Sequence, residues 1–227
     1  MRTIVVVAGG EHTEQALPPD VGLADIVIAA DSGLDLAERL GLSVDLVVGD
    51  LDSVSQGALE RATDAGIRIE RHPIEKDLTD LELAIIASDL AEGDQLIALG
   101  GAGGRLDHLV ANLAVLTGPL TAGTSVEAWL GATRVQVVRG SAVIEGSVGM
   151  TVSLCAWHGP ARGVTTKGFR WELRDSTLDA GTALGTSNEL TTDNATVSVE
   201  SGAVTAIAPE AWTLEAIRVV GVTLEDA

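Results

Sequence analysis

Short apolar runs alternate with helical patterns over the first half of the chain. The runs at 4–8, 26–30, 46–48 and 96–99 are rich in β-branched residues, and each stops at glycine or aspartate. Runs of this length are typical of strands, and because they lack polar positions, both of their faces should be buried. The pattern predicts a mainly parallel sheet with helices on both sides, a Rossmann-like α/β domain.

Helix signals lie between these runs. Two residue pairs have the spacing of a capping box and predict helix starts: Ser53 with Gln56, and Thr79 with Glu82. The first helix should end at Gly66 and the second at about Leu90. A third helix is expected from near Arg105, because apolar residues recur at helical spacing from Leu106 to Leu113.

The pattern of apolar and polar residues changes after about Leu120. Segments rich in Thr and Val, such as 150–156 and 196–200, alternate apolar and polar residues as half-buried strands do. Ser201-Gly202 lies between two such segments and predicts a tight hairpin. We therefore expect two domains, an α/β domain over 1–122 and an antiparallel β domain over 125–227.

Charge and cysteine content narrow the classes of function. The 227 residues include 33 acidic and 14 basic side chains, for a net charge of −19. Such a surface repels nucleic acid and anionic membranes, whereas a small phosphorylated ligand is acceptable if a metal ion supplies positive charge. The single cysteine, Cys155, and the shortness of the apolar run at 4–8 favour a cytoplasmic protein that neither spans nor binds a membrane.

Aspartates follow the predicted strands. Asp31 ends one run, Asp50 and Asp52 follow the next, and Asp77 and Asp80 stand where a helix begins. Ligands of open parallel sheets bind at the carboxyl ends of the strands, so these groups can converge there. In an extended chain Asp50 and Asp52 would point to the same side.

Such convergence needs a cation. Two carboxylates about 4 Å apart repel by about 4 kcal/mol at an effective dielectric near 20. An oxygen-only ligand set favours Mg²⁺, which is usually shared with substrate phosphates. Taken singly, each aspartate also has an ordinary interpretation as a turn, cap or helix-dipole residue.

A glycine-rich stretch, 100–104, connects a predicted strand to a predicted helix. Main-chain amides of such a loop can approach a phosphate closely, and Arg105 adds a positive charge. The stretch is neither a Walker loop nor the dinucleotide fingerprint, and a plain strand-to-helix turn is the alternative. His108 taken alone is more typical of a surface residue than of a catalyst.

Seven stretches, in this order, resemble the thiamine pyrophosphokinase family. They are ADSG (30–33), VGDLDS (48–53), DLTDLE (77–82), GGAGGRLDH (100–108), VTTKGFRW (164–171), TSNE (186–189) and ATVSV (195–199). The resemblance covers nearly the whole chain, and the ordered set is more specific than any one stretch. Ser32 departs from the family pattern, which usually has a second glycine there, and Leu78 replaces a more polar residue.

The resemblance implies a homodimer in which an ATP-binding α/β domain precedes an all-β sandwich that helps to bind thiamine. The β,γ-pyrophosphate of ATP would move to the thiamine hydroxyl, leaving AMP. The resemblance also implies roles for individual residues: Asp50, Asp52 and Asp80 as Mg²⁺ ligands and catalytic residues together with Asp77 and Arg105; Asp31, Gly101, Gly104, Arg105, Asp107 and His108 at the ATP site; and Trp171, Ser187 and Asn188 at the thiamine site.

Several alternatives stay open at this point. Trp171 can equally be a packed core residue of the sandwich. Either Asp31 or Asp77 can orient the attacking hydroxyl. The chain can also be a Mg²⁺-dependent kinase of another small alcohol, which would release ADP, or a non-catalytic nucleotide-sensing module on the same fold.

Overall fold

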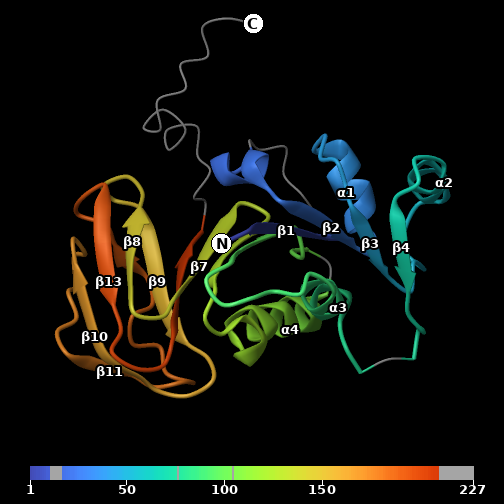
Figure 1. Ribbon diagram of the computed structural model, residues 1–227. Helices are drawn as coiled ribbons and strands as arrows, with labels where there is room; N and C mark the ends of the chain where they lie inside the picture. Colours follow the sequence, from blue (N-terminus) through green and yellow to red (C-terminus); the bar gives the residue numbers. More distant parts are fainter. Residues whose placement is uncertain (11–16, 76, 104, 210–227) are drawn as a thin grey trace, which may run out of the picture. The chain divides into compact units, whose positions relative to one another are not determined.

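The computed structural model describes residues 1–10, 17–75, 77–103 and 105–209. The chain divides into two compact units, Met1–Gly131 and Ala132–Ala227 (Figure 1). The boundary that we expected from the sequence, at 122–125, precedes a strand that pairs in parallel with the strand at 95–99. That strand therefore belongs to the sheet of the first unit.

The described part of the first unit contains a sheet of six parallel strands in the order β6-β5-β1-β2-β3-β4. The strands are β1 (Thr3–Ala8), β2 (Ile26–Ala30), β3 (Leu46–Gly49), β4 (Arg68–Arg71), β5 (Gln95–Leu99) and β6 (Ser125–Leu130). Central β1 is almost completely buried, which agrees with its unbroken apolar sequence. The predicted parallel sheet is confirmed.

Helices cover both faces of this sheet. Figure 1 shows α1 (Gly33–Arg39) on one side, and α3 (Asp80–Ala87) and α4 (Leu106–Thr117) on the other. The fourth helix, α2 (Gln56–Asp64), shares a buried apolar cluster with α1 and with β2 and β3. Short 3-10 turns at Pro19–Leu23 and Pro119–Thr121 complete the unit. The predicted α/β layering is therefore also confirmed.

The helix starts agree with the sequence in two of three cases. Thr79 caps α3 by accepting a hydrogen bond from the Glu82 N–H at 3.2 Å, and α4 follows Arg105. The end predicted for α3 at Leu90 is wrong, since the helix stops at Ala87.

The predicted cap of α2 at Ser53 is also wrong. The N-cap is Ser55, whose hydroxyl accepts a hydrogen bond from the Ala58 N–H at 3.3 Å. Asp35 on α1 accepts hydrogen bonds from both the N–H and the hydroxyl of Ser55. This contact between two helices selects the cap, and local spacing does not reveal it.

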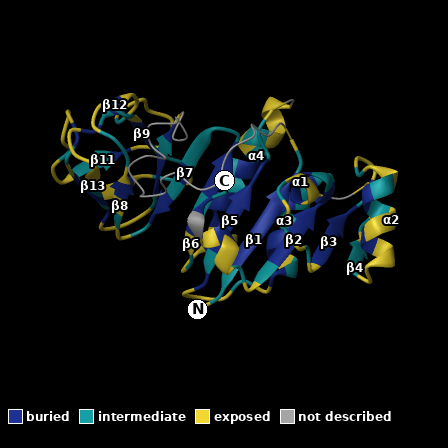
Figure 2. Ribbon diagram, turned by 90° about the horizontal axis from the view of Figure 1, so that it is seen from above, coloured by how far each residue is buried: buried dark blue, intermediate teal, exposed yellow. Residues whose placement is uncertain are grey.

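The second unit is an antiparallel β-sandwich, as the family resemblance implied. One sheet has the order β12-β9-β14-β7 and the other β11-β10-β13-β8. The strands are β7 (Thr133–Val138), β8 (Ser141–Glu145), β9 (Thr151–Ala156), β10 (Ala161–Lys167), β11 (Ser176–Leu178), β12 (Asn188–Glu189), β13 (Asn194–Ser198) and β14 (Val204–Ala208). Buried residues of both sheets, such as Leu154 and Val197, share one core. In Figure 2 the central strands of the first unit are mostly buried, whereas the strands of the second unit mix buried, intermediate and exposed residues.

The hairpin predicted at Ser201-Gly202 is wrong. β13 pairs with β8 and β10, whereas β14 pairs with β7 and β9, so this turn carries the chain from one sheet to the other. Ser201 is held by a bridge to Arg162 instead. Both strands present apolar residues to the shared core, and burial of these residues from opposite sides outweighs the local tendency to pair.

No helix within the described ranges combines the length and the apolar character that crossing a bilayer requires.

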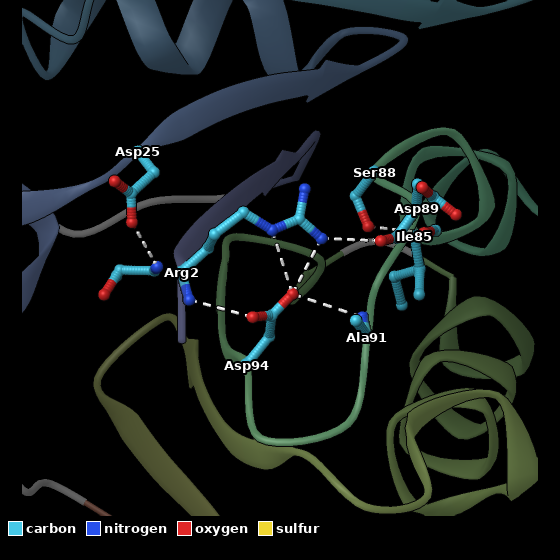
Figure 3. Close-up of polar contacts among 8 residues, drawn as sticks. Arg2, Asp25, Ile85, Ser88, Asp89, Ala91 and Asp94 are labelled. Carbon is cyan, nitrogen blue, oxygen red and sulfur yellow. Dashed lines mark hydrogen bonds and ion pairs between the residues drawn. The ribbon is translucent and has the colours of Figure 1, made fainter.

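An ion pair between a half-exposed arginine and a buried aspartate joins the amino ends of β1 and β5 (Figure 3). The Asp94 carboxylate is 3% exposed and accepts hydrogen bonds from the Arg2 N–H at 2.8 Å, the guanidinium at 2.7 and 3.0 Å, and the Ala91 N–H at 3.2 Å. The Arg2 guanidinium also donates to the Asp89 carbonyl at 2.6 Å. Hydrogen bonds from the main chain and side chain of Arg2 lower the pKa of Asp94 from 3.8 to about 2.

We predict that Asp94→Asn lowers the urea midpoint of unfolding at neutral pH. Because the folded-state pKa lies below the ordinary value, the carboxylate stabilises the fold above about pH 4 and loses this effect as the pH falls toward 2. The difference in midpoint between wild type and variant should therefore shrink over that range. Asp64→Asn, at an exposed position of α2, is the matched control. A difference that stays constant from pH 7 to pH 2.5 would contradict this account.

Candidate active site

The order of the strands indicates where a ligand would bind. The chain proceeds from β1 through β2 and β3 to β4 on one side, and then returns to place β5 and β6 on the other side of β1. In open parallel sheets, ligands bind outside the carboxyl ends of the strands where the direction of winding reverses. The loops after β1 and β5 meet at this point.

These two loops contact each other main chain to main chain. The Gly101 N–H donates to the Gly9 carbonyl at 2.8 Å. A Cβ atom on Gly10 would lie 2.3 Å from the Ala102 carbonyl oxygen, and one on Gly100 would lie 2.1 Å from the carbonyl oxygen of Ala8. Side chains at these positions would push the loops apart, which explains why glycine ends both strands.

Asn112 of α4 supports the same loop and was missed by the sequence reasoning. Its side chain is buried, and Nδ2 donates to the Gly101 carbonyl at 3.5 Å. A Cβ atom on Gly101 would approach this nitrogen to 2.9 Å. The sequence did hold a signal, because Asn112 is the only polar residue within 109–116.

Aspartates gather at the carboxyl edge of the same sheet. Carboxylate oxygens of Asp31, Asp50 and Asp52 all lie within 4.8 Å of one another. Asp80, the first residue of α3, is near them, since its Oδ1 would lie 3.1 Å from a Cβ atom on Gly49. Four of the five aspartates selected from the sequence therefore meet at one edge of the sheet.

The environment of Asp31 opposes its ionisation. The residue is 8% exposed, and burial raises the pKa of its carboxyl group, although a hydrogen bond from the Ser32 N–H acts in the opposite direction. The charges of Asp80, Asp50 and Asp52 raise this pKa further. Its Oδ1 atom is buried and has no hydrogen-bond partner within the described residues.

Asp50 and Asp52 are brought together by a turn. The extended chain that we expected at this position is not present. Leu51 between them has φ 64° and is buried in the core next to α2. The Asp52 N–H donates to Asp50 Oδ1 at 3.3 Å. Burial of Leu51 therefore holds a left-handed turn that an exposed leucine would avoid.

This donor set fits a hard divalent cation. It offers carboxylate oxygens of Asp31, Asp50 and Asp52 from two chain segments, close enough to share one ion. The buried Asp31 oxygen without a hydrogen bond would gain a partner from such an ion. The three side chains of this group are all carboxylates, and an oxygen-only ligand set suits Mg²⁺ better than zinc.

The other predicted residues of the first unit lie around α4 and before α3. Arg105 and Asp107 are exposed and form an ion pair at 2.6 Å, which raises the pKa of the arginine and lowers that of the aspartate. His108 and Asp77 are exposed as well. Gly104 lies outside the described residues.

The three residues selected in the second unit lie side by side. Trp171 is 57% exposed, so the alternative that it packs in the core is wrong. The Arg170 guanidinium lies over its ring at 5.0 Å from the centroid. Asn188 hydrogen-bonds to the Trp171 main chain, and Ser187 precedes it with φ 57° and its N–H bound to Ser153 Oγ at 2.9 Å.

We predict that Gly49→Ala destabilises the protein more than Gly41→Ala. Both glycines have positive φ, so alanine adds strain on the order of 1–3 kcal/mol at either position. At Gly49 the new Cβ atom also approaches Asp31 Cβ and Asp80 Oδ1 to 3.1 Å, whereas at Gly41 it meets open space. Urea unfolding of both variants checks this, and equal midpoints would contradict the close packing of the cluster.

Comparisons with known proteins cover both units. Residues 21–128 match the family model described as thiamin pyrophosphokinase, catalytic domain, and residues 141–204 match the model described as thiamin pyrophosphokinase, vitamin B1 binding domain. A thiamine pyrophosphokinase of Bacillus subtilis (strain 168) is 27% identical over 207 residues, spanning 89% of this chain and 96% of that protein. Thiamine pyrophosphokinase 1 of Arabidopsis thaliana is 26% identical over 203 residues, which span 84% of this chain and 72% of that protein.

Solved structures agree. The crystal structure of thiamine pyrophosphokinase from Bacillus subtilis superposes with a TM-score of 0.77 at 25% identity, covering 92% of this chain and 99% of that one. Thiamin pyrophosphokinase from Candida albicans shares the fold with a TM-score of 0.74 at 15% identity, covering 91% and 90%.

Proposed function

We propose that the chain, which belongs to the thiamine pyrophosphokinase family, is an enzyme that transfers the β,γ-diphosphate of ATP to the hydroxyl of thiamine, giving thiamine diphosphate and AMP. The observation that carries this proposal is the convergence of Asp31, Asp50, Asp52 and Asp80 beside glycine loops at the crossover of a parallel sheet. A polyphosphate bound there would meet both main-chain amides and a cation site.

The first unit, which we expected to span 1–122, supplies the ATP site. Gly101 and, by the family resemblance, Gly104 precede α4 in the chain, and the amides and dipole of a helix N-terminus favour a phosphate. Arg105, Asp107 and His108 lie at that terminus. The present ion pair of Arg105 with Asp107 is exposed, so the guanidinium can turn to a phosphate oxygen at little cost.

Asp50, Asp52 and Asp80 would hold Mg²⁺, with Asp31 beside them. The ion would neutralise charge on the transferred diphosphate. Because Asp31 lies inside the carboxylate group, we assign the orientation of the thiamine hydroxyl to exposed Asp77, which precedes α3. Reactions of this type depend mainly on positioning and charge neutralisation, which is what these side chains provide.

The thiamine-binding surface of the second unit would contain Trp171 and Ser187, with Asn188 bound to the main chain of Trp171. Trp171 offers an exposed aromatic face, which suits an aromatic substrate ring. We also propose a homodimer, in which a second copy covers the exposed apolar residues Leu106 and Val110, one turn apart on α4. Light scattering after gel filtration tests the dimer. The unpaired Cys155 supports a cytoplasmic location.

We predict that Asp52→Asn lowers turnover by about 100-fold or more while the protein stays folded, because one ligand charge of the cation site is lost. AMP formation from ATP, Mg²⁺ and thiamine is measured by mass spectrometry, and folding by circular dichroism. Asp64→Asn, which changes an exposed carboxylate of α2, serves as the control. Near-normal turnover of Asp52→Asn would overturn the metal assignment.

The same assay separates the remaining functions. AMP with thiamine diphosphate supports the pyrophosphokinase, ADP would indicate a kinase of an alcohol, and ATP binding without thiamine consumption would indicate a sensing module. The family assignment favours neither of these two alternatives.

We predict that Trp171→Ala raises the KM for thiamine about tenfold, since loss of an aromatic stacking partner costs about 0.5–1.5 kcal/mol. Trp171→Phe should retain much of the affinity because it keeps a stacking face. The KM for ATP should change less than twofold in both variants. An unchanged KM for thiamine in Trp171→Ala would remove this residue from the substrate site.

A further inference from the structure

Trp171 lies on a loop, and its exposed side chain does not hold this loop in place. The loop, residues 168–175, joins β10 to β11, and the indole is 57% exposed. An exposed side chain that must present one face to a ligand pays a conformational cost on binding unless its backbone is already fixed. Something in the described structure must therefore fix the backbone at Trp171.

The start of the loop is fixed by pairing with the segment at 188–191. Phe169 is buried in the sandwich core and forms a bridge to Leu190. The Arg170 N–H donates to the Glu189 carbonyl at 2.8 Å. The next position of this ladder is Trp171, and there the partner is a side chain.

The Asn188 amide takes the place of a peptide group at this position. Its Oδ1 accepts a hydrogen bond from the Trp171 N–H at 3.1 Å, and its Nδ2 donates to the Trp171 carbonyl at 2.8 Å. Both main-chain polar groups of Trp171 are thus satisfied by one planar side chain. This geometry needs an acceptor and a donor on the same carbon, which a carboxylate does not offer.

Asn188 has little left to offer a substrate. It is 4% exposed, and its Oδ1 also accepts the Glu189 N–H at 2.9 Å. On the other side, its strand β12 pairs with Val152 of β9. We propose that Asn188 is a positioning residue, which fixes the main chain of Trp171 so that the indole is already oriented for the aromatic ring of the substrate.

This inference rests on the proposed function and concerns the thiamine KM. Asn188→Asp keeps the shape of the side chain but places an oxygen against the Trp171 carbonyl, and Asn188→Ala removes both hydrogen bonds. Each variant should raise the KM for thiamine about threefold to tenfold, and by no more than Trp171→Ala does. The KM for ATP and kcat at saturating thiamine should stay within twofold of wild type.

The decisive experiment is a double-mutant cycle of Asn188→Asp with Trp171→Ala, measured by AMP formation over a range of thiamine concentrations. If Asn188 acts through Trp171, the second substitution adds nothing once the indole is gone. Asn194→Ala, at an exposed asparagine of β13, is the matched control and should leave both KM values unchanged. Thermal melts identify a temperature at which all variants remain folded, and the KM values are measured at that temperature.

The outcomes separate this inference from the proposed function. If Asn188→Asp raised the thiamine KM by the same factor in wild type and in Trp171→Ala, the positioning role would be overturned. It would also be overturned if Trp171→Ala raised the thiamine KM and Asn188→Asp left it unchanged. A thiamine KM that Trp171→Ala leaves unchanged would instead overturn the assignment of thiamine to this face, and the positioning role with it.

Discussion

The structure depends on holding several carboxylates together at the carboxyl edge of a parallel sheet. Asp31 is nearly buried, has an oxygen without a hydrogen bond in the described structure, and lies beside Asp50, Asp52 and Asp80. Two ionised carboxylates about 4 Å apart would repel by about 4 kcal/mol at a moderate dielectric. Buried strands and the close approach at Gly49 hold the chain in place despite this repulsion. Strain of this kind is typical of functional sites.

The opposite edge of the same sheet shows what a purely structural aspartate looks like. Asp94 is buried like Asp31, at 3% against 8% exposed, yet it receives four hydrogen bonds, three of them from Arg2, and its pKa falls to about 2. The pKa of Asp31 is raised instead. The same type of side chain thus stabilises the fold at the amino edge, whereas at the carboxyl edge it belongs to the proposed cation site.

Main-chain geometry shapes the proposed binding surface of each unit. In the first unit, glycines let the loops after β1 and β5 contact each other main chain to main chain. In the second unit, Asn188 imitates a peptide group and extends a ladder by one position under Trp171. In both places a rigid backbone presents the groups that a ligand would meet, which reduces the entropy lost on binding.

The sequence by itself determined the alternation of strands and helices, the cap at Thr79, and the placement of aspartates and glycines at strand ends, because these follow from local pattern and from the topology of parallel sheets. Ordered motifs likewise indicated the family. Only the tertiary structure decided the cap at Ser55, the turn at Leu51, the crossing between sheets at Ser201-Gly202 and the exposure of Trp171. Each of these depends on a contact between residues far apart in the chain, and burial or hydrogen bonding across that distance outweighs local preference.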